Sequence, residues 1–145
     1  MNAVRRSSEH FSSMGSDSIE TNVLETVIMS IRPEYADRIL NGSKKYEFRK
    51  KVFGRNVSTI IIYESAPVCR VVGEFRLGGI LCDTPAGLWE KCSGGAGISY
   101  ERYCRYFEKC SVAYALLVKD FVKYQCPKLL SAYGVCPPQS FCYLK

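Results

Sequence analysis

Residues 42–49 read GSKKYEFR, and this stretch decides how the rest of the chain is interpreted. Gly42 is a natural helix terminator, because glycine tolerates a positive φ angle. From Lys44 to Lys50, charged and aromatic residues alternate, which predicts a strand with two different faces. Glu47 and Arg49 then share one face of that strand, where their side chains can pair laterally.

Upstream of this stretch, the sequence predicts a buried strand followed by a short helix. Val27–Ile31 is a short apolar run of the kind that forms a buried strand. Pro33 suits the first position of a helix. Ala36, Ile39 and Leu40 recur at i, i+3 and i+4 spacing, so we expect one apolar helix face.

Downstream, the sequence predicts more strands with helices inserted between them. The expected strands are Ser58–Glu64, Cys69–Leu81, Val112–Val122 and Ser140–Leu144. Thr84 and Ser99 each supply a hydroxyl that can cap the start of a helix. The glycine-rich residues 93–97 are expected to form a flexible loop. This succession predicts an α+β fold built as a small mixed β-barrel with short helices between its strands.

Length and composition favour one domain preceded by a tail. The chain has 145 residues and 47% hydrophobic residues, which is enough for a packed core. Residues 1–24 are rich in Ser, Asn and charge, and we expect a flexible N-terminal tail there and a domain over residues 25–145. Because no apolar run approaches the roughly 18–20 residues of a membrane span, and no apolar signal segment opens the chain, we expect a cytoplasmic protein without membrane contact.

Positive charge is concentrated in one region. The formal net charge is +6, and between Lys44 and Arg55 six cations accompany one anion, Glu47. Such a cluster suits a polyanion, because each phosphate contact releases condensed counterions. A solvated basic face that merely keeps the protein soluble would leave the same pattern.

Metal and cofactor signatures are missing from the sequence. None of the eight cysteines forms a C-x-x-C pair, and the single histidine, His10, lies in the expected tail. We therefore expect no structural metal, and we interpret the cysteines mainly as small buried residues in a reducing compartment. The nucleotide-binding glycine motifs and the zincin and α/β-hydrolase motifs are also absent, so we expect no cofactor.

Residues 42–49 resemble the G-x-K-x-x-E-x-R signature of the ASCH domain, a PUA-like β-barrel family. Further segments are similar to a prokaryotic branch of that family, often labelled as predicted transcriptional regulators. These segments are Ser30–Ala36, Tyr63–Pro67, Gly73–Phe75, Leu88–Lys91, Gly97–Ser99 and Pro137–Phe141. Two positions depart from the branch, since Arg32 stands where lysine is commoner and Cys142 where a basic residue is commoner. The resemblance covers about residues 26–145 and implies a PUA-like fold.

The resemblance implies a binding module for RNA, a nucleotide or a modified base, with a basic cleft at the mouth of the barrel. The residues expected to bind this ligand are Arg32, Lys44, Glu47, Arg49, Tyr63, Ser65 and Ser140. A Glu–Arg pair beside a lysine can read a base edge and neutralise a phosphate. Tyr63 or Tyr143 can stack on a base, and the two serines can add hydroxyl contacts.

Other interpretations stay open at this point. The same pocket could belong to a small hydrolase acting on RNA or on an acylated nucleoside, with Lys44 and Glu47 as its acid–base pair. In family members described as amidohydrolases, the catalytic set resembles a Lys, a Thr three residues later and a distant Glu. Here Lys44 matches the lysine, but Glu47 occupies the threonine position, and a carboxylate cannot simply replace a hydroxyl nucleophile. A regulatory module without a small ligand would instead have a pocket filled by its own side chains. Glu47–Arg49 could also be a purely structural ion pair.

The helical aromatic residues have a simpler interpretation. Trp89, Tyr103, Tyr106 and Phe107 recur at helical spacing. Aromatic residues at that spacing are usually part of a core, and we expect these four to pack there rather than form a surface for base stacking.

Overall fold

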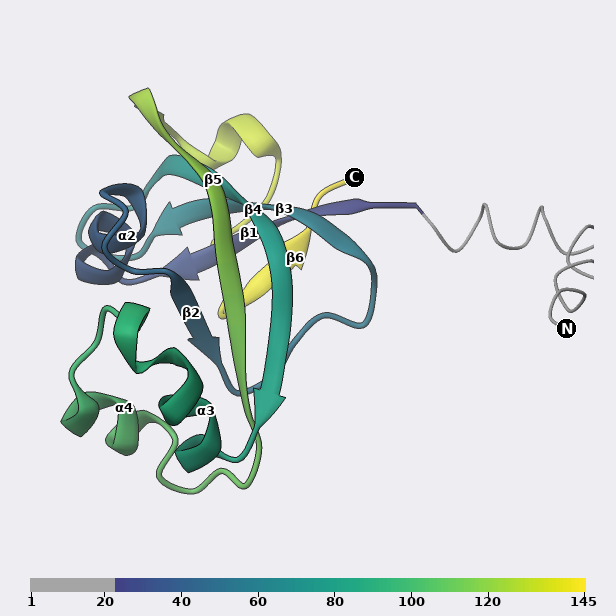
Figure 1. Cartoon of the computed structure of the whole chain (residues 1–145). Helices are drawn as coiled ribbons and strands as arrows, with labels where there is room; N and C mark the ends of the chain where they lie inside the picture. Colours follow the sequence, from purple (N-terminus) through teal and green to yellow (C-terminus); the bar gives the residue numbers. More distant parts are fainter. Residues whose placement is uncertain (1–22) are drawn as a thin grey trace, which may run out of the picture.

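The computed structural model describes residues 23–145 (Figure 1). In chain order its elements, with η for a 3-10 helix, are β1 (Glu25–Ile31), α2 (Pro33–Leu40), β2 (Tyr46–Arg49), β3 (Val57–Glu64), β4 (Arg70–Asp83), α3 (Pro85–Cys92), η2 (Ser93–Gly95), α4 (Tyr100–Tyr106), β5 (Ala113–Lys128), η3 (Leu130–Tyr133) and β6 (Phe141–Tyr143). The expected tail, residues 1–24, falls almost entirely outside the described residues. The division at residues 24 and 25 therefore stays a prediction.

Within residues 23–145, six strands form one sheet in the order β2-β5-β4-β3-β1-β6. The sheet is mixed, since β1 runs parallel to β3 while the other neighbouring pairs are antiparallel. It curls into a half-barrel whose edges are the short strands β2 and β6, and α2 and the α3–α4 pair lie on either side of β2 (Figure 1). The predicted α+β fold with a small mixed β-barrel is confirmed.

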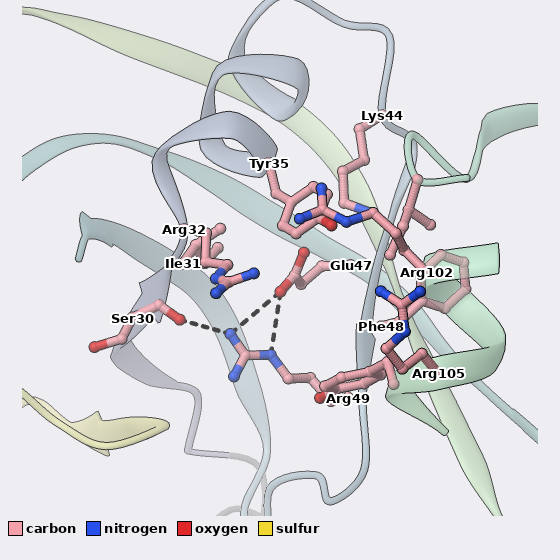
Figure 2. Close-up of a pocket in the computed structure, with 12 residues that line it drawn as sticks. Ser30, Ile31, Arg32, Tyr35, Lys44, Glu47, Phe48, Arg49, Arg102 and Arg105 are labelled. Atoms are coloured by element: carbon pink, nitrogen blue, oxygen red, sulfur yellow. Dashed lines mark hydrogen bonds and ion pairs between the residues drawn. The ribbon is translucent and has the colours of Figure 1, made fainter. Parts of the chain in front are cut away.

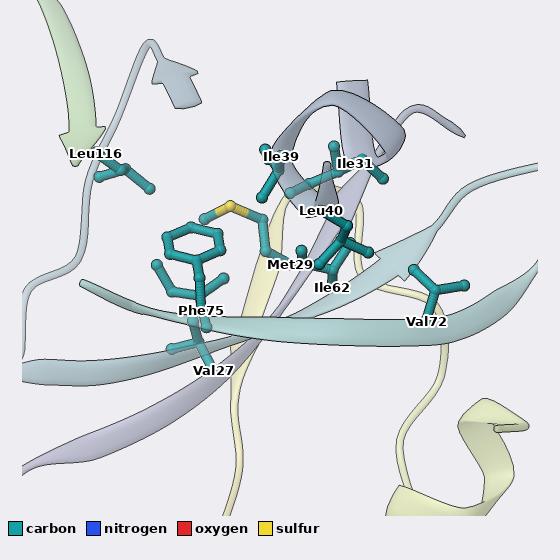
Figure 3. Close-up of a cluster of buried hydrophobic side chains, with 11 residues drawn as sticks. Val27, Met29, Ile31, Ile39, Leu40, Ile62, Val72, Phe75 and Leu116 are labelled. Atoms are coloured by element: carbon teal, nitrogen blue, oxygen red, sulfur yellow. The ribbon is translucent and has the colours of Figure 1, made fainter. Parts of the chain in front are cut away.

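The main core fills the concave side of the curled sheet. Val27 and Met29 of β1 point into it, and Ile39 of α2 closes it, together with Phe75 of β4 (Figure 3). Ile28 points the opposite way, into a second buried cluster that includes Leu130 of η3. Both faces of β1 are therefore buried, which explains why its sequence is a continuous apolar run rather than an alternation.

Strand β5 extends further than its sequence pattern indicates. The prediction ended it at Val122, whereas the strand continues to Lys128. Its outer half is mostly exposed and lacks apolar alternation, but it pairs with the start of β4, where Val71 lies opposite Lys128. In this exposed half, the hydrogen bonds to β4 stabilise the strand, because few of its side chains are buried.

The cysteines only partly match the expectation. All eight lie within the described residues and are free thiols, but Cys92 is the fully buried one. Five are exposed, namely Cys69, Cys82, Cys104, Cys126 and Cys136, so the prediction of mainly buried cysteines is wrong for these. Among residues 23–145, no helix is long and apolar enough to cross a membrane.

Candidate functional site

A pocket of about 390 Å³ opens where the curled sheet fails to close, between β2, α2 and α4 (Figure 2). The described residues that line it are Ser30, Ile31, Arg32, Tyr35, Lys44, Glu47, Phe48, Arg49, Ile98, Arg102, Arg105 and Tyr106. Five of these lining side chains are basic, and Glu47 is the one acid among them. The pocket therefore has a strongly positive lining.

Arg49 connects the two edges of the open sheet. Its Nε donates to Glu47 Oε2 at 3.2 Å, on the same strand face, as the alternation predicts. Its Nη2 donates to the Ser30 carbonyl of β1 at 2.7 Å, and its Nη1 donates to Ser140 Oγ, next to β6, at 3.2 Å. Figure 2 shows this guanidinium crossing the gap between the strands. Arg49 thus joins β2 to β1 and holds the Glu47 carboxylate at the pocket.

Lys44 lies in the pocket wall rather than over its mouth. Its side chain is only 2% exposed, and Nζ donates to the Ala96 carbonyl at 2.7 Å. The ammonium also lies 4.9 Å from the centre of the Phe48 ring and 5.3 Å from that of Tyr35. Burial lowers the pKa of Lys44 to about 8, although the nearby Glu47 carboxylate opposes this effect. This lysine therefore loses its proton at a lower pH than an exposed lysine does.

The glycine-rich segment packs tightly against this lysine. Gly95 and Ala96 are buried, and the Gly95 carbonyl accepts a hydrogen bond from the Lys45 backbone N–H at 2.7 Å. The Gly97 carbonyl accepts from Arg38 Nη1 at 2.9 Å. The segment is therefore not the irregular loop that was expected, since Ser93–Gly95 form η2 and the segment is hydrogen-bonded to Lys45 and Arg38. The glycines permit a close approach of two backbones, which composition alone cannot distinguish from flexibility.

Helix α4 forms the opposite wall. The Ser99 hydroxyl caps its start by accepting from the Arg102 backbone N–H, as predicted. Arg102 and Arg105 are three residues apart and so lie on one helix face, which lines the pocket. Arg102 forms an ion pair with Glu34 of α2, and this hydrogen bond lowers the pKa of the Glu34 carboxyl. No hydrogen bond or ion pair is seen for the Arg105 side chain within the described residues.

The structure brings together most of the predicted site residues. Arg32, Lys44, Glu47 and Arg49 all line the pocket. Ser140 does not line it, but contacts it through its hydrogen bond with Arg49.

Tyr63 and Ser65 lie elsewhere. Tyr63 points away from the core that its neighbour Ile62 enters, because successive residues of a strand face opposite sides. It is buried in the second cluster, on the opposite face of β3. Ser65 follows β3, and its backbone N–H donates to the Ile31 carbonyl at 3.0 Å, but its side chain does not line the pocket. Tyr143 packs against Phe141 on β6, also outside the pocket.

Several pocket residues were not predicted. They are Ser30, Ile31, Tyr35, Phe48, Ile98, Arg102, Arg105 and Tyr106, of which the last three belong to the α4 wall. Tyr103 and Phe107 are core residues as expected, but Tyr106 is 38% exposed at the pocket, so its core assignment is wrong. The spacing of Arg102, Arg105 and Tyr106 at i, i+3 and i+4 was the available signal for a second, polar helix face.

The site combines a basic lining that could bind an anion with a lysine whose pKa is lowered. Among the described residues, no three His, Cys, Asp or Glu side chains gather as a metal site would require. Arginines at the rim can donate hydrogen bonds to phosphate oxygens. Deeper in the pocket, Lys44 offers a hydrogen-bond donor and Glu47 an acceptor.

Comparisons with known proteins agree with this fold. The family model described as "ASCH domain" matches residues 29–123. The large ribosomal subunit protein uL22 of Ureaplasma parvum serovar 3 is 33% identical over 128 residues, which is 87% of this chain and 41% of that relative. This chain therefore spans about two-fifths of the length of that protein.

A curated protein and a crystal structure from Zymomonas mobilis are also similar. One, named ASCH domain-containing ribonuclease, is 34% identical over 94 residues, which is 64% of either chain. The other is a crystal structure described as ASCH from Zymomonas mobilis. It superposes with a TM-score of 0.77 at 31% identity and covers 83% of this chain and 88% of its own.

Proposed function

The chain belongs to the ASCH domain family, and from that premise we propose that its pocket binds RNA. The observation that carries this proposal is the lining, in which Arg32, Lys44, Arg49, Arg102 and Arg105 surround a single carboxylate. A lining of this charge suits the phosphate groups of a polyanion. The name of the ribonuclease relative supports RNA as that polyanion.

The depth of the side chains supports a division of roles. Arg32 and Arg105 are exposed at the rim, where they can contact phosphates. Glu47 is 7% exposed and Lys44 2%, so each is accessible only from within the pocket. An unpaired base can enter the pocket, where the Glu47 carboxylate can accept a hydrogen bond from its edge and the Lys44 ammonium can donate one. Tyr35 also lines this part of the pocket. The pocket is open rather than filled by its own side chains, which disfavours a module without a small ligand.

A second candidate function is hydrolysis of RNA in the same pocket. It is favoured by the name of the ribonuclease relative and by the lowered pKa of Lys44, which lies beside Glu47. Such a pair can act as general acid and base. RNA turnover that Lys44→Ala and Glu47→Ala both abolish would support this function. Equal turnover in all three proteins would mean another site or a contaminating nuclease.

Titration with a short single-stranded RNA tests the binding proposal. If Arg32, Arg102 and Arg105, the three exposed arginines of the lining, each contact one phosphate, raising salt from about 50 to about 200 mM should weaken binding roughly 20-fold, because each contact on a single strand contributes about 0.7 to the salt slope. Fluorescence anisotropy of labelled RNA measures this slope. Binding that is absent, or that does not respond to salt, contradicts the proposal.

A further inference from the structure

The connection between β2 and β3, residues 50–56, carries a second basic surface beside the pocket. Lys50 and Lys51 follow Arg49 directly, and both are exposed. Neither forms an ion pair with a carboxylate among residues 23–145. Their charges therefore face solvent with no protein anion to neutralise them, unlike the rim charge of Arg102, which Glu34 partly neutralises.

Tyr106 joins this surface to the pocket. Its ring is one of the pocket-lining groups and is 38% exposed. Lys50 Nζ lies 4.8 Å from the centre of that ring. Arg105, the preceding residue of α4, also lines the pocket. Cationic and aromatic side chains thus succeed one another from the pocket wall outward, which is the arrangement that binds single-stranded nucleic acid.

The far end of the connection is anchored to β6. Arg55 lies 4.3 Å from the centre of the Tyr143 ring, and the Gly54 backbone N–H donates to the Tyr143 hydroxyl at 3.1 Å. Phe53 packs edge-to-face on Phe141, with ring centres 4.8 Å apart. The two lysines therefore project from a segment whose two ends are both anchored, one by strand β2 and the other by contacts with β6.

From this arrangement we infer that a bound RNA strand leaves the pocket over Tyr106 and continues along Lys50 and Lys51. The inference rests on the proposed function and specifies the ligand as an oligonucleotide rather than a single nucleotide. A pocket of about 390 Å³ is at the small end of ligand pockets, so nucleotides beyond the first must lie outside it. Next to Lys50, these further nucleotides meet cations that form no ion pair among residues 23–145. Next to Arg102, they meet a cation that is already paired with Glu34.

The test compares an oligouridylate of about eight nucleotides with uridine 5′-monophosphate on the full chain. In Lys50→Ala/Lys51→Ala, two lost phosphate contacts predict that the salt slope for the octamer falls by about 1.4, equivalent to a loss of roughly 20-fold in affinity near 0.1 M salt. Affinity for the monophosphate, measured by calorimetry, should change less than about twofold, because its phosphate stays at the pocket. Lys119→Ala/Lys123→Ala removes the same net charge from exposed positions on β5 and should leave the octamer slope unchanged.

The possible outcomes distinguish a failure of the inferred RNA path from a failure of the proposed RNA binding. If the wild type binds the octamer and the Lys50/Lys51 variant keeps its affinity and slope, the inference is wrong while RNA binding stands. Equal losses in the β5 control, or equal losses for monophosphate and octamer, would also overturn it. If the wild type binds neither ligand, the proposed function is wrong and the inference falls with it.

Discussion

Lys44→Met is expected to raise the free energy of unfolding at pH 7 by about 2 kcal/mol and, in the same protein, to abolish most RNA binding. Lys44 is 2% exposed, and burial disfavours its charged form. Methionine has a similar length and removes that cost. Glu47 keeps its partner Arg49, so no buried charge is left alone. The lost hydrogen bond to the Ala96 carbonyl offsets about 1 kcal/mol of the gain.

The pH dependence of this difference identifies its cause. In the folded protein Lys44 releases its proton near pH 8, whereas the unfolded chain releases it near the ordinary value of 10.5. Between these values the unfolded state binds more protons, so the stability of the wild type rises with pH relative to the variant. The advantage of the variant should therefore shrink by about 3 kcal/mol as pH rises from about 8 to about 10.5, since one pKa unit corresponds to about 1.4 kcal/mol.

Urea denaturation of both proteins across this pH range measures the difference, and RNA titration measures the loss of binding. Lys45→Met is the matched control, because Lys45 is the neighbouring residue and is exposed. It should show no stabilisation and no pH-dependent difference. A Lys44→Met variant that is less stable than the wild type at every pH, or a difference that does not vary with pH, contradicts this account of a lysine retained for function.

The local pattern of the chain was sufficient to predict that Glu47 and Arg49 can pair. Strand alternation placed Glu47 and Arg49 on one face, and the structure shows them paired on that face. Alternation gives relative faces only, and it does not show which face meets the pocket. Tyr63 illustrates this limit, because its strand is buried on both sides and either face was equally apolar.

The second wall of the pocket depends on packing between distant segments. Arg102 and Arg105 reach the pocket because Tyr103 and Phe107, on the other face of the same segment, pack against Phe48 of β2. Helical spacing predicts two faces for α4, but nothing in the spacing indicates which strand the apolar face will meet. The contact partner is therefore fixed only by the tertiary structure.

The glycine-rich segment shows why composition misled the prediction there. Loose linkers and tight backbone contacts both favour glycine, the first for freedom and the second for its lack of a side chain. Gly97 belongs to the second kind. A Cβ atom built at this position would lie 2.5 Å from both Cβ and Cγ of Lys44, and its φ angle is +63°. Glycine at this position therefore lets the segment pack directly against the lysine.

Gly97→Ala is therefore expected to lower the free energy of unfolding by about 3 kcal/mol, combining an unfavourable positive φ with overpacking. The added methyl group meets the root of the Lys44 side chain, which cannot rotate away. The segment must move, and the hydrogen bonds from Lys44 to Ala96 and from Arg38 to Gly97 lengthen. Because these bonds position Lys44, RNA affinity should fall together with stability.

Two matched substitutions separate the contributions. Gly134 has a φ of +70° but no atom within 4 Å of a built Cβ, so Gly134→Ala should cost only about 1 kcal/mol. Gly94 has open space and no positive φ, so Gly94→Ala should change stability by less than about 0.5 kcal/mol. Thermal and urea denaturation of the three variants measure these costs. If Gly97→Ala costs no more than Gly134→Ala, the close packing of this segment against Lys44 is not what holds the lysine in place, and the wall of the pocket must be fixed from the β2 side alone.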